Sequence, residues 1–108
     1  MSAERAAFDE TIHAPVRLRI SGLLRGAEKV DFAVLRDTIG ISDATLSKHL
    51  KVLADAGYIT TTKARSAARS DARRLTWVAQ TSKGRAAFDG HVAELRRITG
   101  ESGAPGGA

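Results

Sequence analysis

The sequence of 108 residues predicts a mainly α-helical domain that carries a small β-hairpin wing. Three observations support this prediction. Apolar residues recur at helical spacing in several segments that are bounded by capping residues. Two of these helical segments adjoin across the short turn Gly40-Ile41. After them, two segments that alternate in the manner of strands flank a small, polar and basic stretch, as the strands of a hairpin do.

The first half of the chain contains three predicted helices and one short extended segment. Residues 4–12 place apolar side chains at near-helical spacing. The helix that begins at Pro15 and ends near Gly26 is apolar on more than one side, so we expect it to be central. Lys29–Phe32 is a short extended segment. Ala33–Ile39 forms a third helix, and Gly40 follows it as a residue that can adopt a positive φ.

The segment Ser42–Ala56 is the most informative. Ser42 is a good N-cap, and Gly57 ends the helix. One side of the helix is a buried stripe at i, i+4 and i+7, formed by Leu46, Leu50 and Leu53. The opposite side is small and cationic, with Ala44, Lys48 and Lys51 flanked by Thr45 and Ser47. His49 lies at the edge of the stripe, where we expect a half-buried, hydrogen-bonded side chain.

The second half of the chain predicts a hairpin and a last helix. Tyr58–Lys63 and Arg73–Gln80 are the strands, with Leu75, Trp77 and Ala79 on one face. Trp77 is expected to be a core residue or a hairpin anchor. Thr81 caps the last helix, whose apolar stripe contains Phe88, Val92 and Leu95.

The positive charge is concentrated in one part of the chain. There are 17 basic and 12 acidic residues in total, but residues 48–85 contain nine basic and two acidic ones. The segments on either side are slightly acidic. A localised basic block indicates an anionic partner such as nucleic acid.

Helix, turn, helix and basic hairpin, in this order, predict a winged helix-turn-helix. The exposed side of Ser42–Ala56 would then enter a major groove of double-stranded DNA, with small residues allowing close approach to base edges. The predicted contacts from this helix are Ser42, Ala44, Thr45, Ser47, Lys48 and Lys51. Cations of the hairpin would contact phosphates or a minor groove: Lys63, Arg65, Arg69, Arg73 and Arg74.

Less specific interpretations exist for each element. Lys48 and Lys51 taken alone could be ordinary solvated positions of an amphipathic helix. The basic loop taken alone could be a solvated insertion. His13 and His91 are either incidental or part of a helix contact. Together, on adjacent elements, the two sets of cations favour DNA binding.

Several classes of function are disfavoured. Without Cys there is no disulfide, thiolate metal site or Cys nucleophile. No phosphate-binding glycine loop or H-E-x-x-H spacing is present, so we expect no enzyme, no metal and no cofactor. No apolar run is long enough for a membrane span, and the N-terminus lacks the pattern of a secretory signal; a cytoplasmic protein is expected. Residues 1–99 would form the domain, and residues 100–108 a disordered, glycine-rich tail.

The sequence resembles the winged-helix transcriptional regulators of the MarR and ArsR type, especially the small stand-alone ones. The resemblance covers roughly residues 8–98 and depends on HAPVRLRISGLL at 13–24, the stretch 30–59 with LSKHLKVLADAGYI, and the run from Arg74 to Phe88. It implies that Ser42–Ala56 is the recognition helix, that residues 59–79 are the wing and that the terminal helices form a two-fold dimer. The absence of Cys departs from the metal-sensing members. A small-molecule effector stays an open alternative without a polar pocket to support it.

A homodimer is also expected from the residues themselves. A small core leaves apolar side chains on the first and last helices that would meet a second copy: Phe8, Ile12, Phe88, Val92 and Leu95. The alternative is that both helices pack back on their own domain. A two-fold dimer predicts a palindromic operator. The regulator itself is expected to be a repressor. A competing hypothesis is a winged helix that serves as a protein-interaction module, which salt-dependent binding to mixed DNA fragments would distinguish.

Overall fold

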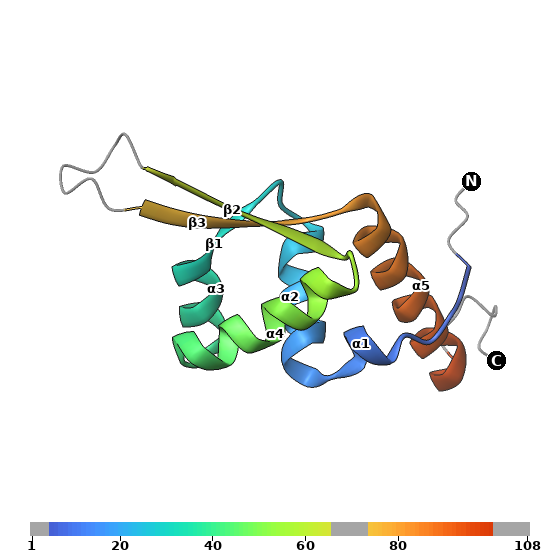
Figure 1. Ribbon diagram of the computed structural model, residues 1–108. Coiled ribbons are helices and arrows are strands. Elements are labelled where there is room, and N and C mark those ends of the chain that lie inside the picture. The colour runs from blue at the N-terminus through green and yellow to red at the C-terminus, as the bar shows by residue number, and fades with distance from the viewer. Residues whose placement is uncertain (1–4, 66–73, 101–108) are drawn as a thin grey trace.

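The computed structural model describes residues 5–65 and 74–100 of the chain. Within them the elements follow the predicted order of helix-turn-helix and hairpin (Figure 1). They are α1 (Glu10–His13), α2 (Pro15–Arg25), β1 (Val30–Asp31), α3 (Phe32–Ile39), α4 (Asp43–Asp55), β2 (Ile59–Arg65), β3 (Arg74–Gln80) and α5 (Ser82–Thr99). The mainly α-helical, winged helix-turn-helix fold is therefore confirmed.

Helix α2 is central, as predicted. It packs against α1, α3, α4, α5 and β3, and Figure 1 shows α2, α3 and α4 beneath the sheet. The apolar stripe of α4 faces this centre, with Ile39 at the end of α3 packed against it. The core cluster consists of Ile20, Leu24, Leu35, Leu46, Leu50, Leu53, Ile59 and Val78.

The sheet is antiparallel with strand order β1-β3-β2. Val30 of β1 and Thr61 of β2 both pair with Val78 of β3, which is completely buried. Since side chains alternate along a strand, Trp77 points to the opposite face. There it is half-buried, with the Lys29 ammonium 4.5 Å from its ring centroid. Of the two interpretations of Trp77, the core residue is wrong, because Val78 fills that role, while the half-buried position on the hairpin agrees with the anchor.

The predicted helix over residues 4–12 is also wrong for most of its length. Residues 5–9 are not helical, and α1 is a single turn that begins at Glu10. The backbone of this segment makes tertiary bonds instead: the Ala7 amide donates to the Gly90 carbonyl at 3.0 Å. A Cβ at Gly90 would lie 2.6 Å from the Arg5 carbonyl oxygen, so the glycine allows the segment to run close along α5.

His91 of α5 is the buried polar centre of this contact. Its Nδ1 accepts the Asp9 backbone N–H at 3.0 Å, and its Nε2 lies 3.1 Å from Nδ1 of His13. Because Nδ1 of neutral His91 accepts, its Nε2 carries the proton and donates to His13. The Phe8 ring lies 4.7 Å from each imidazole, centroid to centroid. Of the two interpretations of these histidines, the helix contact is confirmed.

The same contact reaches the residues that follow α4. The Tyr58 hydroxyl donates to the Asp9 carboxylate at 2.5 Å, while the other carboxylate oxygen caps α1 by accepting the Ile12 amide. The hydrogen bond to Asp9, together with burial, raises the pKa of Tyr58 to about 12. Tyr58 follows directly after α4 and precedes β2, so Asp9 ties the N-terminal segment to the junction between them.

Candidate nucleic-acid interface

The turn between α3 and α4 is closed by local hydrogen bonds. Gly40 adopts a left-handed conformation with φ of 81°, and its amide and that of Ile41 both donate to the Arg36 carbonyl. Ser42 then caps α4, because its Oγ accepts the Thr45 amide at 3.1 Å. The predicted cap and turn are thus confirmed, and they fix the start of α4 relative to α3.

The side of α4 that faces away from the core carries the residues that were predicted to contact DNA. The exposed ones are Ser42, Ala44, Ser47, Lys48 and Lys51. Thr45 is half-buried, and its Oγ1 accepts a hydrogen bond from the Ser42 hydroxyl at 3.0 Å. These side chains are short at the start of the helix and long and cationic in its middle.

A groove of about 430 Å³ separates α4 from the sheet. Its α4 side holds Ser47 and Lys51, and its sheet side holds Lys63. Of the predicted DNA contacts, the groove brings these three together, whereas Ala44 and Lys48 do not line it. The remaining lining residues are Phe32, Asp43, Leu50, Ala54, Thr61 and Thr76.

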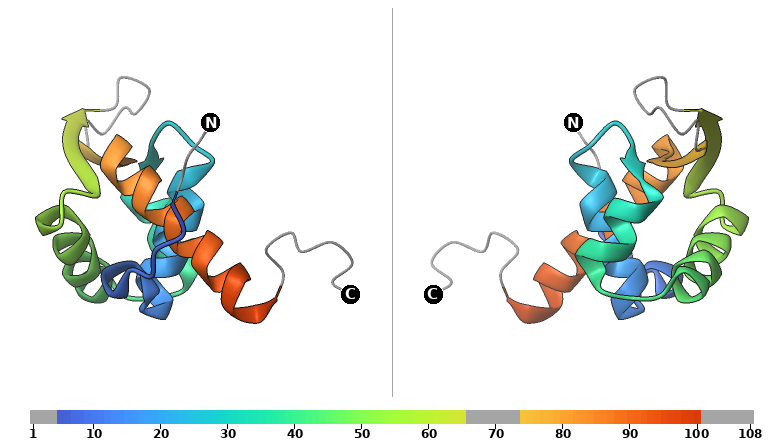
Figure 2. Two further views of the ribbon diagram at one scale, coloured as in Figure 1. Left: turned by 90° about the vertical axis from the view of Figure 1, so that its right-hand side faces the viewer. Right: turned by 90° about the vertical axis from the view of Figure 1, so that its left-hand side faces the viewer.

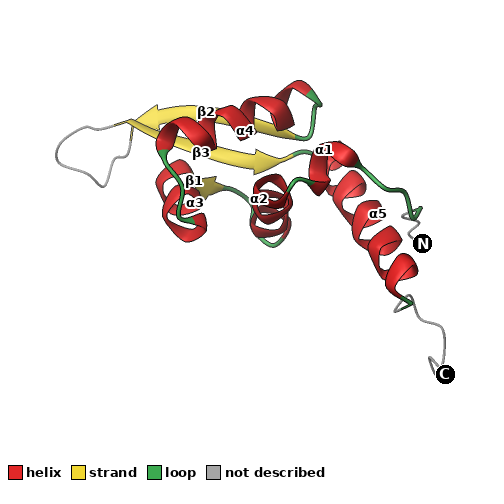
Figure 3. Ribbon diagram, turned by 90° about the horizontal axis from the view of Figure 1, so that it is seen from below, coloured by secondary structure: helices red, strands yellow, loops and turns green. Residues whose placement is uncertain are grey.

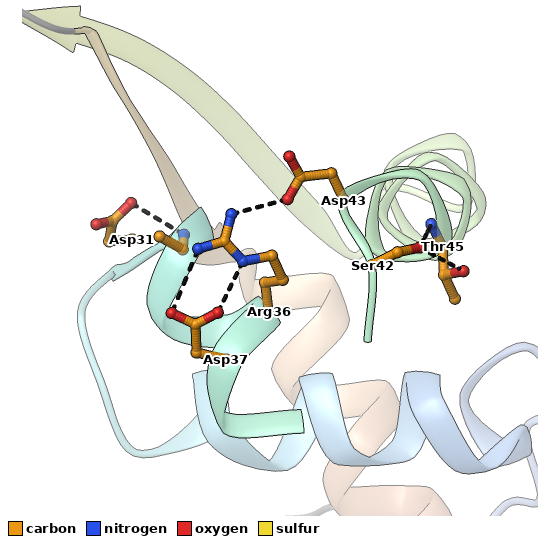
Figure 4. A network of polar contacts seen from close by, with 7 residues as sticks. Asp31, Arg36, Asp37, Ser42, Asp43 and Thr45 are labelled. Atoms are coloured by element: carbon orange, nitrogen blue, oxygen red, sulfur yellow. Dashed lines mark hydrogen bonds and ion pairs between the residues drawn. The ribbon is translucent and has the colours of Figure 1, made fainter. Parts of the chain in front are cut away.

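Three ion pairs modify the charge of this surface. Lys51 lies 3.2 Å from the Asp55 carboxylate one turn later on α4. Arg36 of α3 holds two carboxylates, binding Asp37 with Nε and Nη2 and Asp43 with Nη1 (Figure 4). Hydrogen bonding to Arg36 lowers the pKa of the Asp37 carboxyl and raises that of the guanidinium. All of these carboxylates are largely exposed, so the pairs orient side chains more than they stabilise the fold.

Three of the predicted wing residues lie in the described strands. Lys63 is exposed on β2. Arg65 and Arg74 occupy the outer ends of β2 and β3 and pair with each other in the register of the hairpin. Arg69 and Arg73 lie outside the described residues. The hairpin extends beyond the helices (Figure 1), which places its cations on a projecting element.

His49 has the role that was expected of it. It is half-buried on α4, and its Nδ1 lies 3.0 Å from a guanidinium nitrogen of Arg17 on α2. Because a guanidinium only donates, Nδ1 accepts this bond and His49 stays neutral there. Burial and the nearby charges of Arg17 and Lys48 lower its pKa.

A second surface lies on α5, on the other side of the domain from α4 (Figure 2). Phe88, Val92 and Leu95 are half-buried on their own chain, and Phe88 and Val92 line a groove with Arg25 and Arg96. Ile98 is 59% exposed at the outer end of the helix. Figure 3 shows this end extending away from the sheet and the other helices.

The remaining residues predicted for dimerisation differ from each other. Phe8 is 45% exposed beside the two histidines, so part of its ring stays available. Ile12 is 1% exposed, because α1 packs it inward between α2 and the rest of the domain. The prediction that Ile12 meets a partner is therefore wrong, and this residue follows the alternative in which the first helix packs on its own domain.

In the described residues, no group of three or more His, Asp or Glu side chains is arranged to hold a metal ion. Across the same ranges, no helix is long and apolar enough to cross a membrane.

Sequence reasoning missed three features of the interface. Thr61 and Thr76 line the groove because they lie on the face of the sheet that also holds Lys63, and this follows from the strand register. Thr61 and Lys63 lie two positions apart on one strand, so alternation alone places them on the same face, and the sequence could have predicted Thr61 beside Lys63. The bond between Arg36 and Asp43 spans seven positions and a turn, and no helical or strand spacing predicts such a pair.

A cap-and-turn helix pair, an exposed small and cationic helix face and a projecting antiparallel hairpin define a winged-helix domain of the kind that binds DNA. Residues 16–99 match the protein family described as "Winged helix DNA-binding domain". Since the match covers most of the chain, the protein belongs to this family.

Three individual proteins are similar to this chain in sequence or structure. The uncharacterized protein MJ0432 of Methanocaldococcus jannaschii is 32% identical over 84 residues, which are 78% of this chain and 87% of that protein. The structure of a transcriptional regulator homologue from Pyrococcus horikoshii is similar with a TM-score of 0.76 at 23% identity, over 84% of this chain and 86% of that one. HlyU from Vibrio cholerae is similar with a TM-score of 0.57 at 20% identity, over 82% and 84%. At these identities the structural likenesses show the fold.

Proposed function

We propose that this protein is a cytoplasmic transcriptional regulator that binds double-stranded DNA as a homodimer and acts as a repressor without a metal or cofactor. In this proposal α4 enters the major groove and the hairpin contacts the phosphate backbone or a minor groove. The description of the Pyrococcus horikoshii structure as a transcriptional regulator homologue supports the assignment.

The observation that carries the proposal is the convergence of cations from two elements on one surface. Lys48 and Lys51 project from α4, and Lys63 projects from β2 across the groove. A solvated helix or a solvated loop alone would not require this arrangement. Two elements that present ammonium groups around one groove suit the phosphates on either side of a DNA groove.

Sequence-specific binding follows from the shape of the exposed face of α4. Ser42, Ala44 and Ser47 are short, so the helix backbone can approach base edges. Lys48 lies one turn after Ala44 and can reach a guanine edge or a flanking phosphate. Phosphate contacts alone would position the protein without reading sequence.

The homodimer is supported by the surface of α5. Ile98 and the groove beside Val92 present apolar area that the described part of the chain leaves open. A two-fold pairing through the terminal segments would place two copies of α4 about one helical turn apart on DNA. Repression is the simplest outcome of such binding, because a bound dimer covers its site and excludes other proteins from it.

Selection from a random pool of duplex DNA tests the proposal. We expect enrichment of one motif with two-fold symmetry and half-sites about one turn, or roughly 10 base pairs, apart. Enrichment of a motif without symmetry would contradict the dimer and leave DNA recognition intact. No enrichment at all, together with salt-independent binding, would contradict the proposal and favour a protein-interaction module.

A further inference from the structure

One acidic side chain stands at the leading end of the surface proposed to bind DNA. Asp43 is the first residue of α4, and its side chain is 69% exposed. It lines the groove together with Ser47 and Lys51, which follow it at i+4 and i+8 on the same side of the helix. A carboxylate at this position repels phosphate, so it weakens general affinity for DNA. At the first turn of α4 the carboxylate interacts favourably with the positive end of the helix dipole, and its exposed position also leaves it accessible to DNA.

The Asp43 side chain is held in one orientation. Its Oδ1 accepts from Nη1 of Arg36 at 2.8 Å. Arg36 cannot easily turn away, because its Nε and Nη2 bind Asp37 at 2.8 and 3.3 Å (Figure 4). The Arg36 carbonyl also accepts the amides of Gly40 and Ile41, so this residue is fixed at both its backbone and its side chain. Among the described residues, Oδ2 of Asp43 accepts no hydrogen bond.

An oriented carboxylate with one open oxygen can only accept hydrogen bonds. In the major groove the donors are the amino groups of the bases, and aspartate typically accepts from cytosine N4. Adenine also presents an amino group, but asparagine, which both donates and accepts, is its usual partner. The first residues of a recognition helix are the ones that reach base edges. Asp43 thus has the position and the chemistry to read cytosine.

We propose that Asp43 determines sequence specificity by accepting a hydrogen bond from the N4 amino group of a cytosine, and that Arg36 is the positioning residue that orients it. This inference rests on the proposed function, since it requires α4 to lie in the major groove. Arg36 also offsets the charge of the carboxylate, which reduces its repulsion of the neighbouring phosphates.

The test compares two substitutions that each remove one negative charge from α4. Asp55 is the matched control, because its side chain is 67% exposed and it is also paired with a cation, Lys51. Random duplex DNA is used to select binding sequences for the wild-type chain, Asp43→Asn and Asp55→Asn. Both substitutions should strengthen binding to unrelated duplexes to a similar extent. Only Asp43→Asn should change the selected motif.

For the wild-type chain we expect cytosine at one position of each half-site, and its replacement should weaken binding about five- to tenfold. Asp43→Asn should lose this preference and select adenine there, because asparagine can bond both N6 and N7. A motif that keeps its cytosine in Asp43→Asn would overturn the inference. A change of the same kind in Asp55→Asn would also overturn it, because the effect would then be one of charge alone.

The role of Arg36 has its own readout. Arg36→Gln should reduce the discrimination between the selected duplex and the duplex with that cytosine replaced, and Arg36→Lys should restore part of it. Asp43→Asn should abolish the effect of Arg36→Gln on discrimination, since nothing remains to be oriented. Equal loss of affinity for both duplexes in Arg36→Gln would show that Arg36 only stabilises the turn.

The failure of this inference can be told apart from the failure of the proposed function. If the wild-type chain selects no sequence and binds DNA without salt dependence, the proposed function fails. If it selects a clear motif that is the same in Asp43→Asn, DNA binding stands and the assignment of Asp43 is wrong.

Discussion

The two ends of this domain are built from different kinds of interaction. Around α4, the side chains of interest are exposed and are held by surface ion pairs such as those of Arg36 and Lys51. Around α5, the central group is a fully buried histidine whose bonds reach Asp9 and His13. Surface ion pairs contribute little to the free energy of unfolding, whereas buried hydrogen bonds are costly to break.

This difference implies that the two regions can be altered independently. Substitutions of the exposed lysines of α4 should change DNA binding and leave stability almost intact. Substitutions at His91 should change stability, and those at the outer end of α5 should change assembly. The division of roles would be contradicted if one of these substitutions changed DNA binding, stability and assembly together.

The largest effect is expected at His91. His91→Ala should lower the free energy of unfolding by about 2–4 kcal/mol, because it creates a cavity and leaves the Asp9 amide without its acceptor. Chemical denaturation measures this. His13→Ala removes an exposed imidazole from the same pair and should cost about 1 kcal/mol or less. Equal losses of stability for both variants would show that the burial of His91 does not determine the loss.

Lys48→Ala should be the most damaging of the lysine substitutions for DNA binding. We expect a loss of about 1–3 kcal/mol in binding of the selected duplex if Lys48 contacts a base edge, with a change in sequence preference. Stability should change by less than about 0.5 kcal/mol. Arg19→Ala, which removes an equal charge from α2 and not from the exposed face of α4, is the control. Unchanged affinity in Lys48→Ala would contradict the assignment of α4 as the recognition helix.

The assembly can be tested at the exposed end of α5. Ile98→Glu should weaken the homodimer at least about tenfold, because a charge would be buried in an apolar contact. Val34 is the matched control, since it is 52% exposed on α3. Sedimentation measurements should give Val34→Glu the same assembly mass as the wild-type chain. A wild-type chain that is monomeric at high concentration would refute the dimer.

A smaller effect is expected from pH. Burial, and next to it the charge of His13, lower the pKa of His91, so the folded protein keeps this residue neutral. The unfolded chain takes up a proton near its ordinary pKa of about 6.5. Stability should therefore be fully present above about pH 6.5 and decline as the pH falls toward the lowered value. His91→Gln should flatten this decline, because glutamine does not titrate. A stability that rises on acidification would mean that folding raises the pKa of His91, which would contradict the prediction.

The sequence predicted the elements around α4 well because local rules determine them. Ser42, Gly40 and the stripe of Leu46, Leu50 and Leu53 each act within one or two turns of helix. The fold class and the exposed face of α4 followed from these residues. The likeness of LSKHLKVLADAGYI to known regulators agreed with them.

The features for which the sequence-based prediction is wrong are determined by tertiary contacts. Residues 5–9 have helical spacing, yet their amides bind Gly90 and His91, which are more than 80 positions away. Trp77 and Val78 are both apolar, and only the packing of the sheet on the helices determines which one faces inward. The local pattern around Ile12 does not show that it is buried, because the elements that cover it lie elsewhere in the sequence. Such outcomes depend on register and docking, which no local pattern contains.

The central claim is that cations of α4 and the wing contact DNA phosphates across one groove, and the salt dependence of binding tests it most directly. The logarithm of the binding constant for a duplex should fall linearly with the logarithm of salt concentration. Lys63→Ala should reduce the magnitude of that slope by roughly one and weaken all sequences alike. A wild-type slope near zero, or the same slope in Lys63→Ala, would contradict the claim.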